Sequence, residues 1–114
     1  MPVEFVVNGR PVAQRNVVAD GTPRTIELDV PVERSSWIAA RILASSHTNP
    51  IFVLVGGQPI RTSRRSAQWC LDAVSQCWTQ KKARTTASDL EAAQKGYEHA
   101  RQVYRQLLAE CTRE

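Results

Sequence analysis

The spacing of apolar residues changes near residue 62, and this change limits the fold more than any other feature of the sequence. Before it, apolar and polar residues alternate in short runs that end at Gly, Asn or Pro, which is typical of β-strands. After it, apolar residues recur every three or four positions, which is typical of amphipathic helices. We therefore expect one α+β domain of 114 residues, with a β-rich part over residues 1–61 and a helical hairpin over residues 62–114.

The first part predicts a small antiparallel, sandwich-like sheet of five or six strands. The turn pair Asn8-Gly9 predicts a tight hairpin, because both residue types tolerate positive φ. The expected strands are Val3–Val7, Val12–Val18, Arg24–Val30, Trp37–Leu43 and Ile51–Val55, with Gln58–Arg61 as the sixth. Because Ile51–Val55 is apolar at every position, it predicts a central strand that is covered on both faces.

The second part predicts two helices joined by a short linker. Ser63 or Ser66 can cap the first helix, and Ser88 and Glu91 have the spacing of a capping box at the start of the second. The apolar stripes consist of Ala67, Cys70, Leu71, Val74 and Trp78 in the first helix and of Leu90, Ala93, Tyr97, Ala100, Tyr104, Leu107 and Cys111 in the second. Two helices with one stripe each predict an antiparallel hairpin with these stripes as its core.

The chain has no pattern of metal ligands, and we expect no metal and no cofactor. Its three cysteines, Cys70, Cys77 and Cys111, form neither a CxxC motif nor a Cys/His ligand spacing. Cys70 and Cys77 would lie about 10 Å apart along one helix, too far for a disulfide. No run approaches the roughly 20 apolar residues that span a bilayer, and the first residues do not resemble a signal peptide. We therefore expect no membrane partner, and the sequence leaves the compartment open.

His47 lies in the polar segment Ser45–Pro50, between two expected strands. Catalysis or metal binding would require an orienting carboxylate, a nucleophile or further ligands, and none lies nearby in the sequence. We therefore interpret His47 as a residue that organises its loop through hydrogen bonds. Asn49 belongs to the same interpretation, because Pro50 biases it toward an extended conformation.

Two arginines complete the set of candidate inter-domain or loop-organising residues, which is Arg41, His47, Asn49 and Arg61. Arg41 interrupts the apolar side of its expected strand, so it requires either an internal salt bridge or a contact with a neighbouring domain. Arg61 begins one basic cluster, and a second cluster lies at the other end of the first helix, about 25 Å away. Such a distance does not suit one compact groove, so we do not expect a nucleic-acid partner.

Five segments of the chain resemble the C-terminal region of CehA/McbA-type metallohydrolases, which are relatives of the PHP amidohydrolase-like enzymes. These segments are SSWIAAR, SHTNPIFV, GQPIR, SAQWCLDAVSQCW and YEHARQVYRQLL, and the resemblance covers nearly the whole chain. In that family a metal-binding hydrolase domain precedes this region, and its clustered histidines and acids have no counterpart here. The resemblance implies a noncatalytic accessory module, a fragment of a longer chain, whose partner is the hydrolase domain of that parent and whose parent is exported.

The residues leave other functions open. Trp37 and Trp69 are candidates for stacking a carbohydrate or another polymer, and burial of both side chains would remove the basis of that alternative. A basic nucleic-acid-binding module is a further alternative, although the separation of the basic clusters argues against it. A homo-oligomer is also compatible with the sequence. We do not expect the chain by itself to be an enzyme.

Overall fold

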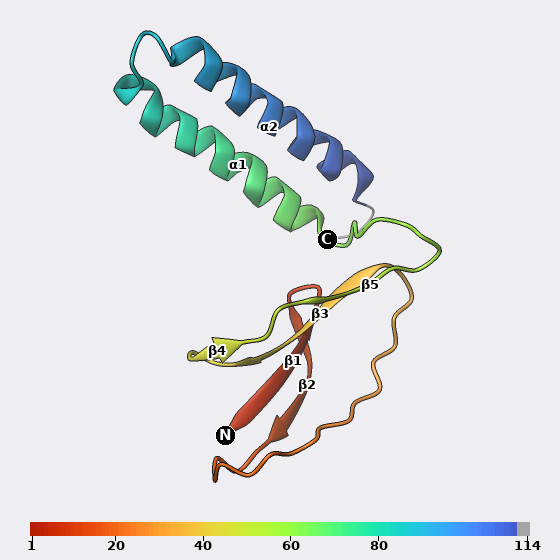
Figure 1. Ribbon diagram of the computed structural model, residues 1–114. Coiled ribbons are helices and arrows are strands. Elements are labelled where there is room, and N and C mark those ends of the chain that lie inside the picture. Colours follow the sequence, from red (N-terminus) through yellow and green to blue (C-terminus); the bar gives the residue numbers. More distant parts are fainter. Residues whose placement is uncertain (112–114) are drawn as a thin grey trace. The chain divides into compact units, whose positions relative to one another are not determined.

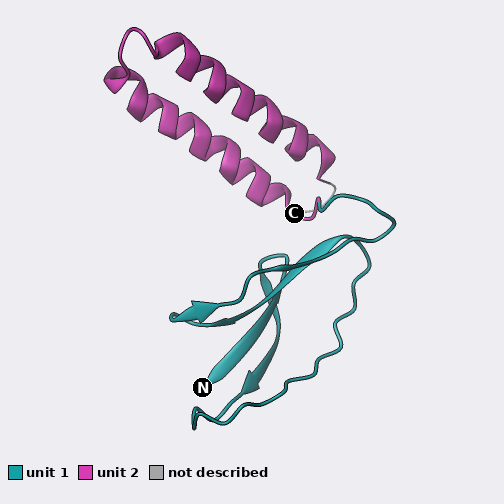
Figure 2. Ribbon diagram, viewed as in Figure 1, with its two compact units in different colours: residues 1–60 teal, residues 61–114 magenta. Residues whose placement is uncertain are grey.

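The computed structural model describes residues 1–111. The chain divides between Ile60 and Arg61 into two compact units (Figure 2), one residue from the expected boundary. The first unit is an antiparallel β-sheet and the second is a pair of helices, so the α+β fold class is confirmed. The two units are described separately below.

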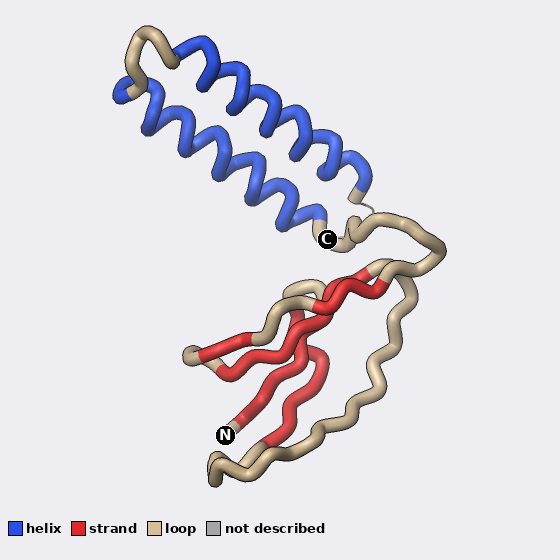
Figure 3. Tube along the Cα trace, in the orientation of Figure 1, coloured by secondary structure: helices blue, strands red, loops and turns tan. Residues whose placement is uncertain are grey.

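Five strands form one antiparallel sheet (Figures 1 and 3). They are β1 (Pro2–Val7), β2 (Arg10–Asn16), β3 (Ser36–Ile42), β4 (Ser46–His47) and β5 (Ile51–Val53). The order is β2-β1-β3-β4, and β5 also pairs with β3. Because β1 occupies one edge of β3, β4 and β5 share the other edge and follow one another along it.

The turn between β1 and β2 confirms the expected hairpin. Asn8 and Gly9 have φ angles of 51° and 87°, as the tight turn requires. The Asn8 side chain also joins this turn to β3, because its Nδ2 donates to Ser36 Oγ at 3.0 Å and its Oδ1 accepts from the Trp37 backbone N–H at 3.1 Å. The asparagine therefore fixes both the turn and the position of the next strand.

The expected strand Arg24–Val30 is wrong. Within the described part of the chain, residues 25–33 make no hydrogen bond, and they run beside the sheet as an extended segment (Figure 3). Their exposure still alternates, with Ile26, Leu28 and Val30 half-buried and the residues between them exposed. The alternation of apolar and polar residues predicted correctly which side chains are half-buried. In the described part of the chain, however, no strand lies beside this segment to form backbone hydrogen bonds with it. Gln58–Arg61 is not a strand either. The sheet reaches five strands through β4, a two-residue strand that was not expected.

The expectation that Ile51–Val55 is a central strand is also wrong. Only Ile51–Val53 is β-strand, and it pairs with β3 alone, at the edge of the sheet. Ile51 is 68% exposed and Phe52 is 65% exposed. An apolar pattern predicts that side chains require cover, but it does not say whether the same chain supplies that cover.

The second unit is an antiparallel hairpin of α1 (Arg64–Lys81) and α2 (Leu90–Glu110), with a short 3-10 helix at Lys82–Arg84 between them. Ser63 caps α1, as one of the two expected caps, because its Oγ accepts from the Ser66 N–H at 3.1 Å. Trp78 is buried, and its ring centroid lies 4.9 Å from that of Tyr97. The expected stripe therefore provides the contact between the helices.

The expected capping box at the start of α2 does not form. The helix begins after Asp89, whose side chain makes no capping hydrogen bond. Thr86 Oγ1 donates to Asp89 Oδ2 at 2.7 Å and also lies 3.1 Å from Ser88 Oγ, so side chains of the linker bind one another. Among the described residues, neither helix has a stretch apolar enough to cross a bilayer.

Candidate functional site

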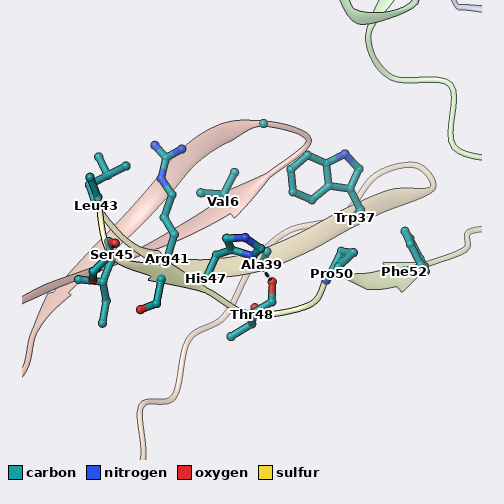
Figure 4. Close-up of a pocket in the computed structure, with 14 residues that line it drawn as sticks. Val6, Trp37, Ala39, Arg41, Leu43, Ser45, His47, Thr48, Pro50 and Phe52 are labelled. Carbon is teal, nitrogen blue, oxygen red and sulfur yellow. Dashed lines mark hydrogen bonds between the residues drawn. The ribbon is translucent and has the colours of Figure 1, made fainter.

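One face of the sheet contains a hollow of about 690 Å³ (Figure 4). Its lining is mainly apolar and includes Val6, Trp37, Leu43, Pro50 and Phe52. The strand register explains why these side chains meet, because directly paired residues of antiparallel strands lie on the same face. Trp37 pairs with Phe52 across β3 and β5, and Val6 pairs with Ala39 across β1 and β3. The hollow therefore follows from the pairing of three strands.

Two aromatic side chains form one end of the hollow. Phe52 stands at the edge of the sheet and is largely exposed, whereas Trp37 is half-buried beside it. Gly9 adds to this end, since a Cβ atom at its position would lie 3.9 Å from the Trp37 ring. Trp37 and Phe52 are direct cross-strand neighbours, so this end of the hollow suits an apolar or aromatic ligand.

Arg41 lines the hollow and forms an internal salt bridge, one of the two arrangements expected for it. Its Nε donates to Glu4 Oε2 at 2.8 Å, and the two residues are direct neighbours across β3 and β1. Arg41 is the one Lys, Arg, Asp or Glu side chain among the described residues of the lining. Because Glu4 balances its charge, the hollow presents a nearly neutral surface.

His47 also lines the hollow, and the hydrogen bond of its side chain is local. Nδ1–H donates to the Thr48 carbonyl at 3.0 Å, and the side chain is otherwise exposed. Thr48 has a larger role in the loop, because its Oγ1 accepts from the Ala40 N–H at 3.0 Å and its own N–H donates to the Ala40 carbonyl at 2.9 Å. These two bonds continue the ladder of β3 between β4 and β5. Thr48 was not among the four candidate residues.

The other two candidate residues lie outside the hollow. Asn49 is exposed and takes part in none of the side-chain hydrogen bonds of residues 1–111. Arg61 belongs to the helical unit, where its Nε donates to Glu110 Oε2 at 2.6 Å. The hydrogen bond from Arg61 lowers the pKa of Glu110, and a hydrogen bond from Gln106 contributes a smaller lowering. The structure thus brings Arg41 and His47 together and leaves Asn49 and Arg61 apart from them.

Ser35 and Ser36 are buried polar residues that the sequence analysis did not identify. Ser35 Oγ accepts from the Val55 N–H at 2.9 Å and donates to the Gln58 carbonyl at 2.6 Å, so it holds the segment that follows β5. Ser36 Oγ donates to the Arg34 carbonyl at 2.8 Å. Because pairs of serines are also common in exposed turns, the sequence does not show that these two are structural. Only their hydrogen-bond partners in the folded chain show that they hold the sheet.

Comparison with known proteins adds no relative: no protein-family model, curated protein or solved structure matches this chain. Within residues 1–111, no group of three or more His, Cys, Asp or Glu side chains is arranged to hold a metal ion.

Proposed function

We propose that this chain is a noncatalytic accessory module that packs against the hydrolase domain of a longer, metal-dependent hydrolase-like protein. The sequence resemblance supplies the identity of the partner. The observation that supports the docking is the position of β5, an entirely apolar strand at an exposed edge of the sheet. Natural proteins normally pair, cover or charge such an edge, because an exposed apolar edge promotes aggregation.

The hollow extends this exposed edge into a docking surface. Trp37, Phe52 and Leu43 provide apolar area around it, and Phe52 and Leu43 are each 65% exposed. Contiguous apolar area with a polar rim is typical of protein–protein interaction sites. Because the Arg41 charge is balanced by Glu4, a partner does not have to neutralise a buried charge there. An apolar surface of the hydrolase domain is the matching partner.

Hydrogen exchange in the chain and in the parent protein tests the docking. We expect the backbone amides of Ile51–Val53 to exchange at least tenfold more slowly in the parent protein, since packing suppresses local opening. Phe52→Ser should lower the melting temperature of the parent, whereas Val18→Ser, at an exposed residue outside the hollow, should leave it nearly unchanged. Equal exchange in both forms, or a reading frame without a hydrolase domain, would contradict the proposal.

An activity assay tests the noncatalytic part of the proposal. The chain should show no turnover of ester or phosphoester substrates in the presence of Mg²⁺, Mn²⁺ or Zn²⁺. His47→Ala is the matched variant, because His47 is the one histidine that lines the hollow. Turnover that is reproducible with the chain and lost in the variant would show that the hollow is an active site.

A second candidate function, carbohydrate or polymer binding, is favoured by the exposure of two tryptophans. Trp37 is half-buried in the hollow and Trp69 is 70% exposed, so the condition that would have removed this alternative is not met. Trp37 and Phe52 offer neighbouring aromatic faces on which sugar rings can stack. Titration with glycans should then change the tryptophan fluorescence of the chain but not of Trp37→Leu, and an unchanged signal in the wild type would exclude this function for the glycans used.

A further inference from the structure

The helical hairpin has an apolar groove of about 580 Å³ along one side. Its lining includes Trp69, Ala73 and Cys77 from α1 and Gly96, Ala100 and Tyr104 from α2, and none of the described lining residues is charged. Tyr97 also lines the groove, and its ring packs on the buried Trp78 of α1. The groove is therefore the outer surface of the hairpin core.

Two large exposed apolar side chains flank this groove: Trp69 lines it, and Val103 lies beside its lining residues on α2. Trp69, on α1, is 70% exposed, and Val103, on α2, is 40% exposed. Val103 follows Gly96 and Ala100 by seven and three residues, a spacing that places the three on one face of α2. The open side of the hairpin thus has one exposed apolar side chain on each helix.

A contact between the helices shows where Trp69 and Val103 lie along the axis of the hairpin. Arg101 Nε donates to Ser75 Oγ at 3.4 Å, so these residues lie at one level of the hairpin. Trp69 lies about 9 Å from that level toward the start of α1, and Val103 about 3 Å toward the end of α2, at 1.5 Å per residue. The helices are antiparallel, so both side chains lie in the same half of the hairpin, on different helices.

We infer that this face binds the same face of a second copy of the chain, around a two-fold axis parallel to the helices. Such an axis places α1 of each copy against α2 of the other, and it brings Trp69 within about 6 Å, along the helix axis, of the second copy's Val103 twice. The four neighbouring helices are then antiparallel, as in many four-helix bundles. One exposed apolar residue on each helix, about 6 Å apart along the helix axis and in the same half of the hairpin, suits an interface between identical copies.

Gly96 supports a close approach by another helix. A glycine inside a helix is unfavourable compared with alanine, and a Cβ atom at this position would meet no atom of the chain within 4 Å. Packing within the hairpin therefore gives no reason for a glycine here. A second copy does, because small residues such as Ala73, Gly96 and Ala100 allow two helices to lie close together.

The size and charge of the face also suit a second copy. A face two helices wide and about 27 Å long offers on the order of 500 Å² per copy, or about 1,000 Å² in a dimer, near the lower limit for specific interfaces. The groove lacks charged residues, so its partner does not have to be acidic or basic. Each copy has a net charge of +4, so added salt should strengthen the association by screening the repulsion.

Sedimentation equilibrium of the reduced chain tests the dimer between about 1 µM and about 1 mM, the range that suits weak interfaces. We expect the wild type to dimerise reversibly, and Val103→Lys or Trp69→Glu to weaken the dimer at least tenfold. Gln102→Lys is the matched control, because it adds the same charge at the neighbouring exposed residue, which points about 100° away from Val103 around the helix. It should leave dimerisation within about twofold of the wild type.

Mixing the two weakened variants tests the pairing itself. A mixed dimer of Trp69→Glu and Val103→Lys has one native contact and one Glu–Lys contact, so the mixture should dimerise more tightly than either variant alone. Gly96→Leu, which favours the helix but fills the groove, should weaken the dimer while raising the melting temperature. A monomeric wild type, a dimer that survives Val103→Lys and Trp69→Glu, or a mixture without recovery would each overturn the inference.

Discussion

The sheet and the helical hairpin differ in the side chains that they bury. The buried residues of the sheet are Val6, Ser35 and Ser36, so two of the three are hydroxyl side chains bound to backbone groups. Those of the hairpin are Ala67 and Trp78, which are apolar. Buried hydroxyls therefore bind backbone groups within the sheet unit, whereas buried apolar side chains pack between the two helices, beside hydrogen bonds such as that from Arg101 to Ser75.

This difference explains where each unit has apolar surface to offer. In the sheet, the large apolar side chains of β5 and the hollow lie outside the hydrogen-bonded centre, so a broad surface is open to a partner. In the hairpin, Trp78 is inside, while Trp69 and Val103 are exposed and flank a groove. We expect the sheet to suit a large domain surface and the hairpin to suit another pair of helices.

The largest expected effect is loss of the hairpin in Trp78→Ala. Removal of a buried tryptophan that packs on Tyr97 should destabilise the hairpin by about 3–5 kcal/mol, through lost burial and the cavity left behind. Circular dichroism should show loss of helix at a lower temperature, while the amide signals of the sheet keep their positions. Trp69→Ala, at an exposed tryptophan and at concentrations too low for association, should cost less than about 0.5 kcal/mol.

Ser35→Ala should have the next largest effect, confined to the sheet. It leaves the Val55 N–H and the Gln58 carbonyl without their hydroxyl partner, at a cost of about 1–3 kcal/mol. Hydrogen exchange of residues 51–58 should accelerate, and the helical signal should not change. Ser45→Ala is the matched control, because Ser45 is exposed and its hydroxyl donates only to the Ile42 carbonyl at 3.3 Å. Equal effects of the two variants would show that Ser35 does not hold the sheet.

The sequence predicted the elements whose partners lie close along the chain. The Asn8-Gly9 turn, the Ser63 cap and the two amphipathic helices depend on neighbours within a few residues or on one helix face, and all three are confirmed. The place of β5 depends on which strands cover it, and the partners of Ser35 lie 20 and 23 residues away. Periodicity contains no such long-range information, so Arg24–Val30 and the central position of Ile51–Val55 were wrong.

The candidate site was predicted only in part, for a related reason. The sequence marked Arg41 and His47, which do lie in the hollow, because a charge or an imidazole among apolar residues is conspicuous. It did not mark Thr48 or Phe52, since a threonine in a turn and a phenylalanine in an apolar run are ordinary. The strand register alone shows that Phe52 faces Trp37.

Thr48 and His47 provide a smaller test within one loop of the sheet. Thr48→Val removes the hydroxyl that accepts from the Ala40 N–H and should cost about 1 kcal/mol, since that donor then lacks its protein partner. His47→Ala loses one exposed hydrogen bond to the Thr48 carbonyl and should cost about 0.5 kcal/mol. Urea midpoints of both variants check this order. A larger loss in His47→Ala would mean that the imidazole, and not the threonine, organises the loop.

The smallest expected effect is a loss of hairpin stability in acid. The serine hydrogen bonds of the sheet should not weaken in the same pH range. Hydrogen bonds from Arg101 and then Arg105 lower the pKa of Glu98, and those from Arg61 and then Gln106 lower the pKa of Glu110. A lowered pKa means that the folded hairpin favours the ionised carboxylate, so this stabilisation is fully present above the ordinary pKa of 4.5 and is lost as the pH falls through the lower, folded-state values. Serine hydroxyls do not titrate in this range, so Ser35 and Ser36 keep their bonds.

The melting temperature of the helical signal should therefore decrease slightly between neutral pH and acid. This decrease should be smaller in the double variant Glu98→Gln, Glu110→Gln, and also at high salt, because salt screens exposed ion pairs. A decrease of the same size in the double variant would show that other groups cause the acid sensitivity of the hairpin.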